Sequence, residues 1–332
     1  MWDDVIARVR GLSSRLLGRP TLEYLALSRD LAAFVKRLEP TSYSAVATAG
    51  VSVALVAERQ TRRIAGDRLT TIADWCGTRA ELLAPLFEDE DRRNLRALTR
   101  GVVAHVSPEQ CAAGLLPTPT LPVASIQALA GEARIADLGA TLVAWGNPYG
   151  AAILSEATRA HPDLFALQLA IDRTYAKRTA PIAKRAGAPV VALVRTIVDG
   201  ENARAALAVA AGSVEHPSDA LFIDGGQIIT AALFRDLSAL PVSEASASLA
   251  RVVAGTVLAP LAAASSDDRE AAVLTAMLRE LRRAARRSPL SLSVVIEYVL
   301  ALRAELNDLA RIIWGIALRV PRRRIASRLV TP

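Results

Sequence analysis

The sequence predicts an all-α protein made of three homologous helical-bundle domains, on three observations. Alanine and leucine, both strong helix formers, dominate a chain of 332 residues that is 52% apolar but only 4% aromatic. No run of alternating β-branched residues is long enough to build a sheet. A short helical pattern also recurs three times, about a third of the chain apart. Three copies at near-equal spacing indicate three related domains.

The recurring pattern combines an acid, an amide-like group and two aliphatic residues. Its copies read Asp91-x-x-Asn94-Leu95-x-x-Leu98, Asp199-x-x-Asn202-Ala203-x-x-Ala206 and Glu305-x-x-Asp308-Leu309-x-x-Ile312. Offsets of three, four and seven place the four residues of each copy on one face of a helix. A proline follows each copy (Pro108, Pro217 and Pro321), and we expect it to open a second, shorter helix. The predicted domains are residues 1–117, 118–226 and 227–332, with approximate boundaries and terminal helices that can pack across repeats.

Helical periodicity covers most of the chain, and glycine and proline divide it. We expect helices over 2–17, 21–38, 42–65, 69–86, 91–105 and 292–318. The proline-rich segment 116–122 is the clearest candidate for an inter-domain linker. The pair Gly225-Gly226 is expected to end a helix and form a turn.

No pattern predicts catalysis, a cofactor or a metal site. A phosphate-binding loop needs Gly-Lys, a dipeptide that the sequence lacks. The acidic runs 88–91 and 267–268 could hold magnesium in an all-α enzyme, but both precede arginine-rich segments. We interpret them as first-turn acids that favour the positive end of the helix dipole. The histidines (His105, His161 and His216) and cysteines (Cys76 and Cys111) lack metal-ligand spacing.

The charge and hydropathy of the chain point to partners at its surface. The mean hydropathy of +0.28 is high, yet the apolar runs 44–57 and 252–266 are too short to span a membrane. The start, Met1-Trp-Asp-Asp, lacks the positive charge of a signal peptide, so we expect a cytoplasmic protein. The net charge of +7 comes from arginine runs without interleaved aromatics or a nucleic-acid motif. These runs are either solvated helix faces or contacts with an anionic membrane or acidic partner.

Segments along the whole chain resemble the C subunit of bacterial and archaeal V/A-type rotary ATPases, called d in eukaryotic V-ATPases. No single motif is diagnostic, and the order of the segments carries the resemblance. The segments are 7–12, Asp91-Arg-Arg-Asn-Leu-Arg-Ala-Leu98, 171–175, Val198-Asp-Gly-Glu-Asn-Ala-Arg204, 223–226, 288–290, 296–298 and Val320-Pro321.

The resemblance implies three helical domains arranged as a funnel around a pseudo-threefold axis. It also implies a subunit without catalytic residues, peripheral on the cytoplasmic face of the cell membrane. Its partners would be the membrane-embedded proteolipid ring and the central shaft, with no nucleic acid and no small-molecule substrate. Such a subunit passes torque in support of ATP-linked proton or sodium transport. The alternatives are a free-standing helical scaffold of the same ancestry and, more distantly, an all-α magnesium-dependent enzyme.

Ten residues are candidates for partner contacts or for signatures of the repeat. They are Arg8, Arg10, Asp91, Asn94, Arg96, Asp199, Asn202, Arg204, Glu305 and Asp308. Arg96 and Arg204 follow their acids by five positions and are either surface charges or groups that face the shaft. The third copy has Asp308 where the other two have asparagine, so we expect it to make weaker polar contacts.

Overall fold

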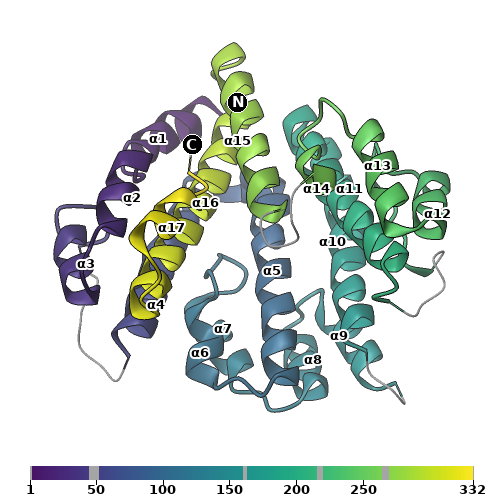
Figure 1. Ribbon diagram of the computed structural model, residues 1–332, viewed down its shortest axis with the longest axis horizontal. Helices are drawn as coiled ribbons and strands as arrows, with labels where there is room; N and C mark the ends of the chain where they lie inside the picture. The colour runs from purple at the N-terminus through teal and green to yellow at the C-terminus, as the bar shows by residue number, and fades with distance from the viewer. Residues whose placement is uncertain (1, 45–51, 160–162, 215–219, 264–268, 332) are drawn as a thin grey trace. The chain divides into compact units, whose positions relative to one another are not determined.

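The protein is helical throughout the part that its computed structural model describes, residues 2–44, 52–159, 163–214, 220–263 and 269–331 (Figure 1). No strand occurs in these residues, which confirms the predicted all-α class. The helices of the first half are α1 (Asp3–Ser13), α2 (Arg19–Ala26), α3 (Leu31–Leu38), α4 (Val53–Cys76), α5 (Ala84–Val103), α6 (Pro108–Ala113), α7 (Val123–Ala130), α8 (Ile135–Ala144) and α9 (Gly150–Ala157), with a 3-10 helix at Gly77–Leu83. Those of the second half are α10 (Leu164–Ala186), α11 (Ala188–Ala210), α12 (Ala231–Ala239), α13 (Val242–Val252), α14 (Pro260–Ala263), α15 (Arg269–Arg287), α16 (Ser293–Ala317) and α17 (Arg322–Ser327).

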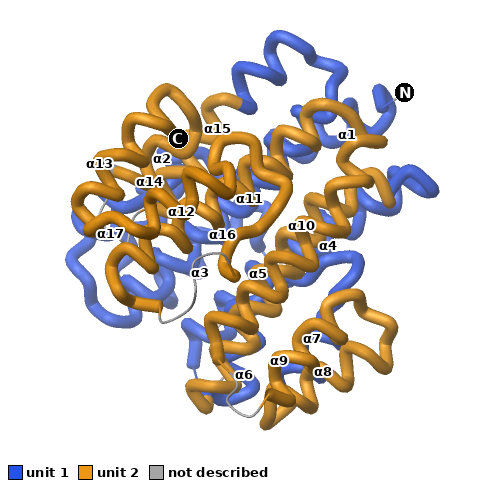
Figure 2. Tube along the Cα trace, turned by 90° about the vertical axis from the view of Figure 1, so that its right-hand side faces the viewer, with its two compact units in different colours: residues 1–80, 106–131, 281–332 blue, residues 81–105, 132–280 orange. Residues whose placement is uncertain are grey.

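The chain forms two compact units (Figure 2). Unit 1 comprises Met1–Ala80, Val106–Gly131 and Leu281–Pro332, so it joins the two ends of the sequence. In it α16 packs against α1, α2, α3, α4 and α17. Aromatic and aliphatic side chains of α2, α3 and α16 fill the core between them, including Leu25, Phe34 and Ile312. The long predicted helix at 292–318 is therefore the central helix of unit 1.

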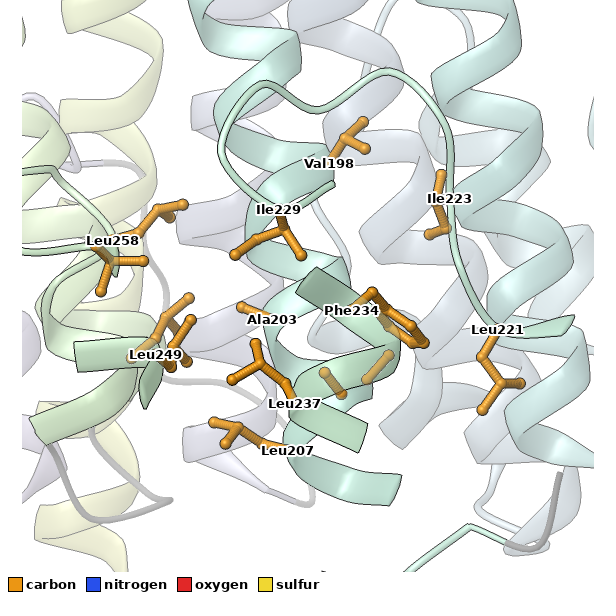
Figure 3. Close-up of a cluster of buried hydrophobic side chains, with 14 of the residues drawn as sticks. Val198, Ala203, Leu207, Leu221, Ile223, Ile229, Phe234, Leu237, Leu249 and Leu258 are labelled. Atoms are coloured by element: carbon orange, nitrogen blue, oxygen red, sulfur yellow. The ribbon is translucent and has the colours of Figure 1, made fainter. Parts of the chain in front are cut away.

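Unit 2 comprises Glu81–His105 and Glu132–Glu280. Its long helices α5, α10 and α11 pack side by side, and α12 and α13 pack on α11. Figure 3 shows the apolar core that α11 shares with α12, α13 and the segment that follows α11, where Ile223, Ile229 and Phe234 are buried around Ala203. Small side chains on α11 allow these bulky neighbours to approach its backbone.

Two of the trailing prolines open short helices, as predicted. Pro108 is the first residue of α6, and Pro321 is the N-cap of α17. Pro217 lies outside the described residues. The position of these prolines agrees with their fixed backbone angle and missing N–H.

Several predicted helix boundaries are wrong. The helix expected over 21–38 is two helices, α2 and α3, because the Asp30 side chain caps the start of the second. The helix expected over 2–17 ends at Ser13, and the one expected from 42 begins at Val53 with Ser52 as its N-cap.

Helix α4 runs without a break through the gap expected between 65 and 69, because Gly66 is buried against Pro117 rather than ending a helix. Helix α5 starts at Ala84 instead of Asp91, with Pro85 in its first turn. The acidic run 88–91 therefore lies within α5, and the interpretation as first-turn acids was wrong.

The segment 116–122 is buried within unit 1 rather than extended between compact units. Leu116, Thr118 and Leu121 are buried, and Thr118 closes a turn with Leu121 through the backbone and its own hydroxyl. The division into three repeats concerns internal homology rather than compactness. It stays a prediction.

We predict opposite effects of alanine at two helical glycines. A Cβ at Gly66 would lie 2.8 Å from Pro117 Cβ and 2.9 Å from its carbonyl oxygen, whereas a Cβ at Gly11 meets nothing within 4 Å. We expect Gly66→Ala to lower the free energy of unfolding by about 1–2 kcal/mol through overpacking. Gly11→Ala should raise it by about 0.5–1 kcal/mol through helix propensity. Urea unfolding measures both, and equal effects would contradict the close packing at Gly66.

Candidate functional site

The three repeat stripes point inward on the long helices α5, α11 and α16. None of the four residues in any copy is exposed by more than 4%. The predicted helical face is therefore real, and its polar members lie in the interior. Buried polar groups must find hydrogen-bond partners, and the polar residues of the second and third copies find them in the segments that pack on their helices.

In the second copy, Asp199 binds the backbone of a distant segment. Its carboxylate accepts hydrogen bonds from the N–H groups of Gln227, Ile228 and Ile229, at 2.9–3.0 Å. A Cβ on Gly226 would overlap the same carboxylate, so only glycine allows this approach. The glycine pair thus forms the expected turn but does not end a helix, since α11 already ends at Ala210.

Asn202, one turn further along α11, makes a reciprocal pair with Ile223. Its amide nitrogen donates to the carbonyl oxygen of Ile223 at 2.8 Å, and its amide oxygen accepts from the N–H of Ile223 at 2.9 Å. An asparagine side chain offers both a donor nitrogen and an acceptor oxygen, so it can satisfy the C=O and the N–H of one residue together.

In the third copy, Glu305 binds groups from the N-terminal part of unit 1. It accepts from the N–H of Leu17, from the Tyr43 hydroxyl and from the Arg68 guanidinium. Burial raises the pKa of Glu305, and the Tyr43, Leu17 and Arg68 donors act against this rise. Burial, followed by the Glu305 charge, raises the pKa of Tyr43 well above its usual value. The network therefore joins α16 to the segment between α1 and α4.

Asp308 occupies the position of Asn202 and binds the end of the chain. Its two carboxylate oxygens accept from the N–H groups of Val330 and Thr331, at 2.7 and 2.8 Å. Asn202 on α11 and Asp308 on α16 thus each bind backbone groups of residues that follow them by 21–23 positions in the chain. The prediction of weaker polar contacts in the third copy was wrong. Val330 and Thr331 offer two N–H donors, and the two oxygens of Asp308 accept one each.

The acidic run of α5 is engaged by cationic and hydroxyl groups within unit 2. Glu88 accepts from the Tyr149 hydroxyl and from Arg178, and Asp89 accepts from Arg92 and Arg93. Among the described residues no group of three or more histidine, cysteine or acidic side chains could hold a metal. Asp267 and Asp268 lie outside those residues.

A buried ionic cluster joins α5, α10 and α11. Arg92 is the largest fully buried side chain, and its guanidinium contacts Asp89 at 2.8 Å, Asp172 at 2.6 Å and Glu201 at 2.6 Å. Three carboxylates from three helices therefore surround one guanidinium. Arg96 and Arg204 bind the outer side of the cluster.

Arg96 contacts Asp172 at 3.2 Å and Glu201 at 3.1 Å, and Arg204 contacts Glu201 at 2.5 Å. Both arginines are partly exposed and ion-paired, so they are more than solvated surface charges. Their predicted place facing a shaft stays a prediction. Sequence reasoning missed Asp172 and Glu201 as members of this cluster. The available signal was an acid inside an otherwise apolar helix, as in 171–175 and 198–204.

The two shared carboxylates have opposite pKa shifts. Burial raises the pKa of Asp172, and the nearby Glu201 charge adds to the rise against Arg92 and Arg96. Burial also acts to raise the pKa of Glu201, but Arg204, Arg92 and Arg96 together hold it well below its usual range. Glu201 is therefore the carboxylate whose charge the three arginines stabilise most.

The two N-terminal candidates lie at the surface of unit 1. Arg8 stacks over the Trp75 ring at 5.6 Å, and Arg10 donates to the Pro289 carbonyl at 2.8 Å. A partner contact for these two stays a prediction. By contrast, Asp91, Asn94, Asp199, Asn202, Glu305 and Asp308 are buried, which favours their interpretation as signatures of the repeat.

A family model described as "ATP synthase (C/AC39) subunit" matches residues 5–328. The match therefore includes all three stripe helices and both polar networks. No curated protein is similar enough to match the chain. None of the helices in the described part is long and apolar enough to cross a membrane.

We predict that removing the charge of Glu201 costs more than removing that of Asp172. A lowered pKa means that Glu201 contributes stability above its unfolded pKa near 4.5, and that this is lost as pH falls through the folded pKa. The raised pKa of Asp172 has the opposite sign: its contribution is present below 3.8 and lost as pH rises. At pH 7, Glu201→Gln should cost about 3–5 kcal/mol and Asp172→Asn less.

Unfolding of both variants and the parent chain between pH 2 and 7 tests this order. The cost of Glu201→Gln should shrink as the pH falls below about 4.5, as the parent loses that stabilisation. A larger cost for Asp172→Asn at pH 7 would reverse the assignment of charge within the cluster.

We also predict that the amide of Asn202 on α11 and the carboxylate of Asp308 on α16 cannot replace each other without loss of stability. Asn202→Asp leaves the Ile223 carbonyl facing a carboxylate, and Asp308→Asn points an amide N–H at a backbone donor. Each should cost about 1–3 kcal/mol, the penalty of an unsatisfied buried group. Asn147→Asp is the matched control, because the Asn147 side chain accepts from Tyr149 N through its oxygen. That control should be within about 0.5 kcal/mol of the parent in urea unfolding.

Proposed function

The chain belongs to the ATP synthase (C/AC39) subunit family, that of the C or d subunits of V/A-type rotary ATPases, and from this premise we propose that it is a non-catalytic rotor coupler. It would lie on the cytoplasmic face of the proteolipid ring and receive the central shaft. In that position it would pass torque between ring and ATPase head during ATP-linked transport of protons or sodium. The family match over residues 5–328 is the observation that carries this proposal.

The contacts that hold each unit together support a role in transmitting torque. In unit 1, α16 is joined to the N-terminal part by Glu305 and to the C-terminal end by Asp308. In unit 2, Arg92 joins α5 to α10 and α11. Displacing these helices would separate buried charges and hydrogen-bonding groups, which is costly. Close-packed interiors with such links transmit strain rather than absorb it.

The partners of the buried acidic side chains also support a structural role for the subunit. Asp89, Asp172 and Glu201 are all bound by arginines, and Asp199 and Asp308 are bound by backbone N–H groups. Their ligands are groups of the chain itself, which is how a helical framework uses buried acids.

The surface offers both apolar and cationic groups for partners. Leu318, at the end of α16, is 71% exposed. Exposed arginines follow it directly, at 319 and 322–324. Apolar burial gains about 25 cal/mol per Å², whereas an exposed ion pair gives about 0–1 kcal/mol. We therefore assign affinity for the ring mainly to apolar contact, and orientation to the arginines.

Cross-linking in the assembled motor tests the rotor role directly. A coupler turns with the ring, so a covalent link between this chain and a ring subunit should leave ATP hydrolysis and coupled ion transport running. A link between the chain and the non-rotating head should stop both. The same reagent on complexes that lack this chain is the control for nonspecific inhibition.

The free-standing scaffold alternative predicts a different result. A scaffold would yield no cross-link to ring or shaft, and motor activity would be independent of the chain. Loss of activity on linkage to the ring would instead place the chain among the stationary parts. Either outcome would end the rotor proposal.

A further inference from the structure

A cationic cavity of about 430 Å³ lies in unit 1, at the junction of α1, the end of α15 and the start of α16. Three arginines line it: Arg10 from α1, and Arg282 and Arg286 from α15. The other lining residues are Ser13, Ala285, Pro289, Val294 and Glu297. The cavity is separate from the repeat stripes and from the buried ionic cluster.

The charges around the cavity are unbalanced. Arg282 pairs with Glu297 at 3.2 Å, whereas Arg10 donates to a neutral acceptor, the Pro289 carbonyl. Arg286 lies one turn beyond Arg282 on the same face of α15 and is exposed. Three guanidinium groups thus face one carboxylate. The resulting positive potential attracts anions into the cavity.

The neighbouring backbone adds to this preference. Val294 in the first turn of α16 lines the cavity, and the N-terminal end of a helix carries partial positive charge. Planar guanidinium groups match the oxygen geometry of phosphate better than an ammonium group does. The geometry and the charge favour a tetrahedral oxyanion over a lone carboxylate, because donors come from two helices.

We propose that this cavity binds a phosphate group through Arg10 and Arg286, with Arg282 held in place by Glu297. Phosphate chemistry is shared by free phosphates and by the headgroups of anionic phospholipids. Leu290, in the turn beside Pro289, is 63% exposed and would reach into a lipid surface when a headgroup occupies the cavity. The site is independent of the rotor proposal, since it requires neither ring nor shaft.

A structural role of the same arginines makes a different prediction. Arg286 lies in the last turn of α15, where a cation also favours the helix dipole. That role would be seen as a change in stability without any change in anion binding. Measuring both separates the two roles.

The test uses the full chain, with pyrophosphate in calorimetry and with vesicles in flotation. Vesicles of phosphatidylcholine alone are compared with vesicles that contain phosphatidylglycerol. The double variant Arg10→Gln/Arg286→Gln should weaken binding at least about tenfold, the equivalent of one lost charge-assisted contact. The matched control is Arg195→Gln/Arg251→Gln, which removes the same charge from exposed positions on α11 and α13 that do not line the cavity. Thermal melting of all variants verifies folding, and Arg286→Gln alone serves if the double variant unfolds.

The arms also separate the two sources of phosphate. Binding to phosphatidylglycerol vesicles that Leu290→Ser weakens supports the site and assigns it to lipid. Pyrophosphate binding without any binding to phosphatidylglycerol vesicles supports the site and assigns it to free phosphates. Equal weakening in the cavity variant and in the Arg195→Gln/Arg251→Gln control would mean general electrostatics and overturn the proposal. So would an absence of binding to both probes at millimolar anion.

Discussion

The structure depends on one constraint: polar groups placed in the middle of long buried helices must be satisfied. An unpaired buried carboxylate or amide costs about 1–3 kcal/mol or more, so the stripes of α11 and α16 fix the segments that pack against them. Asp199 and Asn202 hold the turn and extended backbone at 223–229. Glu305 and Asp308 hold both ends of the chain on α16. The apolar cores provide most of the affinity between helices, but these groups decide the register.

The ionic cluster of unit 2 follows the same constraint with full charges. Burying Arg92 is costly, and only several carboxylates in close contact offset that cost. Burial, with the Glu201 charge adding to it, raises the pKa of Asp172, whereas Arg204, Arg92 and Arg96 outweigh the effect of burial and lower the pKa of Glu201. Arg96 and Arg204 then stabilise the ionised Glu201 from the solvent side. Removing any one of these charged side chains would leave a buried partner with an uncompensated charge, so the cluster stabilises unit 2 as a whole.

The sequence was sufficient for the all-α class and for the shared helical face of each stripe, because composition determines the first and periodicity the second. It was insufficient for the start of α5, where the acidic run looked like a helix beginning but pairs with Tyr149, Arg178 and arginines of its own helix. The burial of Gly66 against Pro117 depends on a contact 51 residues away. The partners of Arg96 are still more distant in the sequence, on α10 and α11. Local sequence patterns do not indicate which distant residues contact each other in the folded chain.

The substitution of asparagine by aspartate in the third copy shows how related helices avoid wrong pairings. Ile223 offers one N–H and one C=O, which suit Asn202, whereas Val330 and Thr331 offer two N–H groups, which suit Asp308. If either segment docked on the other helix, a buried donor or acceptor would remain unpaired. That penalty acts against an exchange of the two segments between α11 and α16. What looked like a weakened copy of the motif is therefore a distinct one, matched to the backbone it must hold.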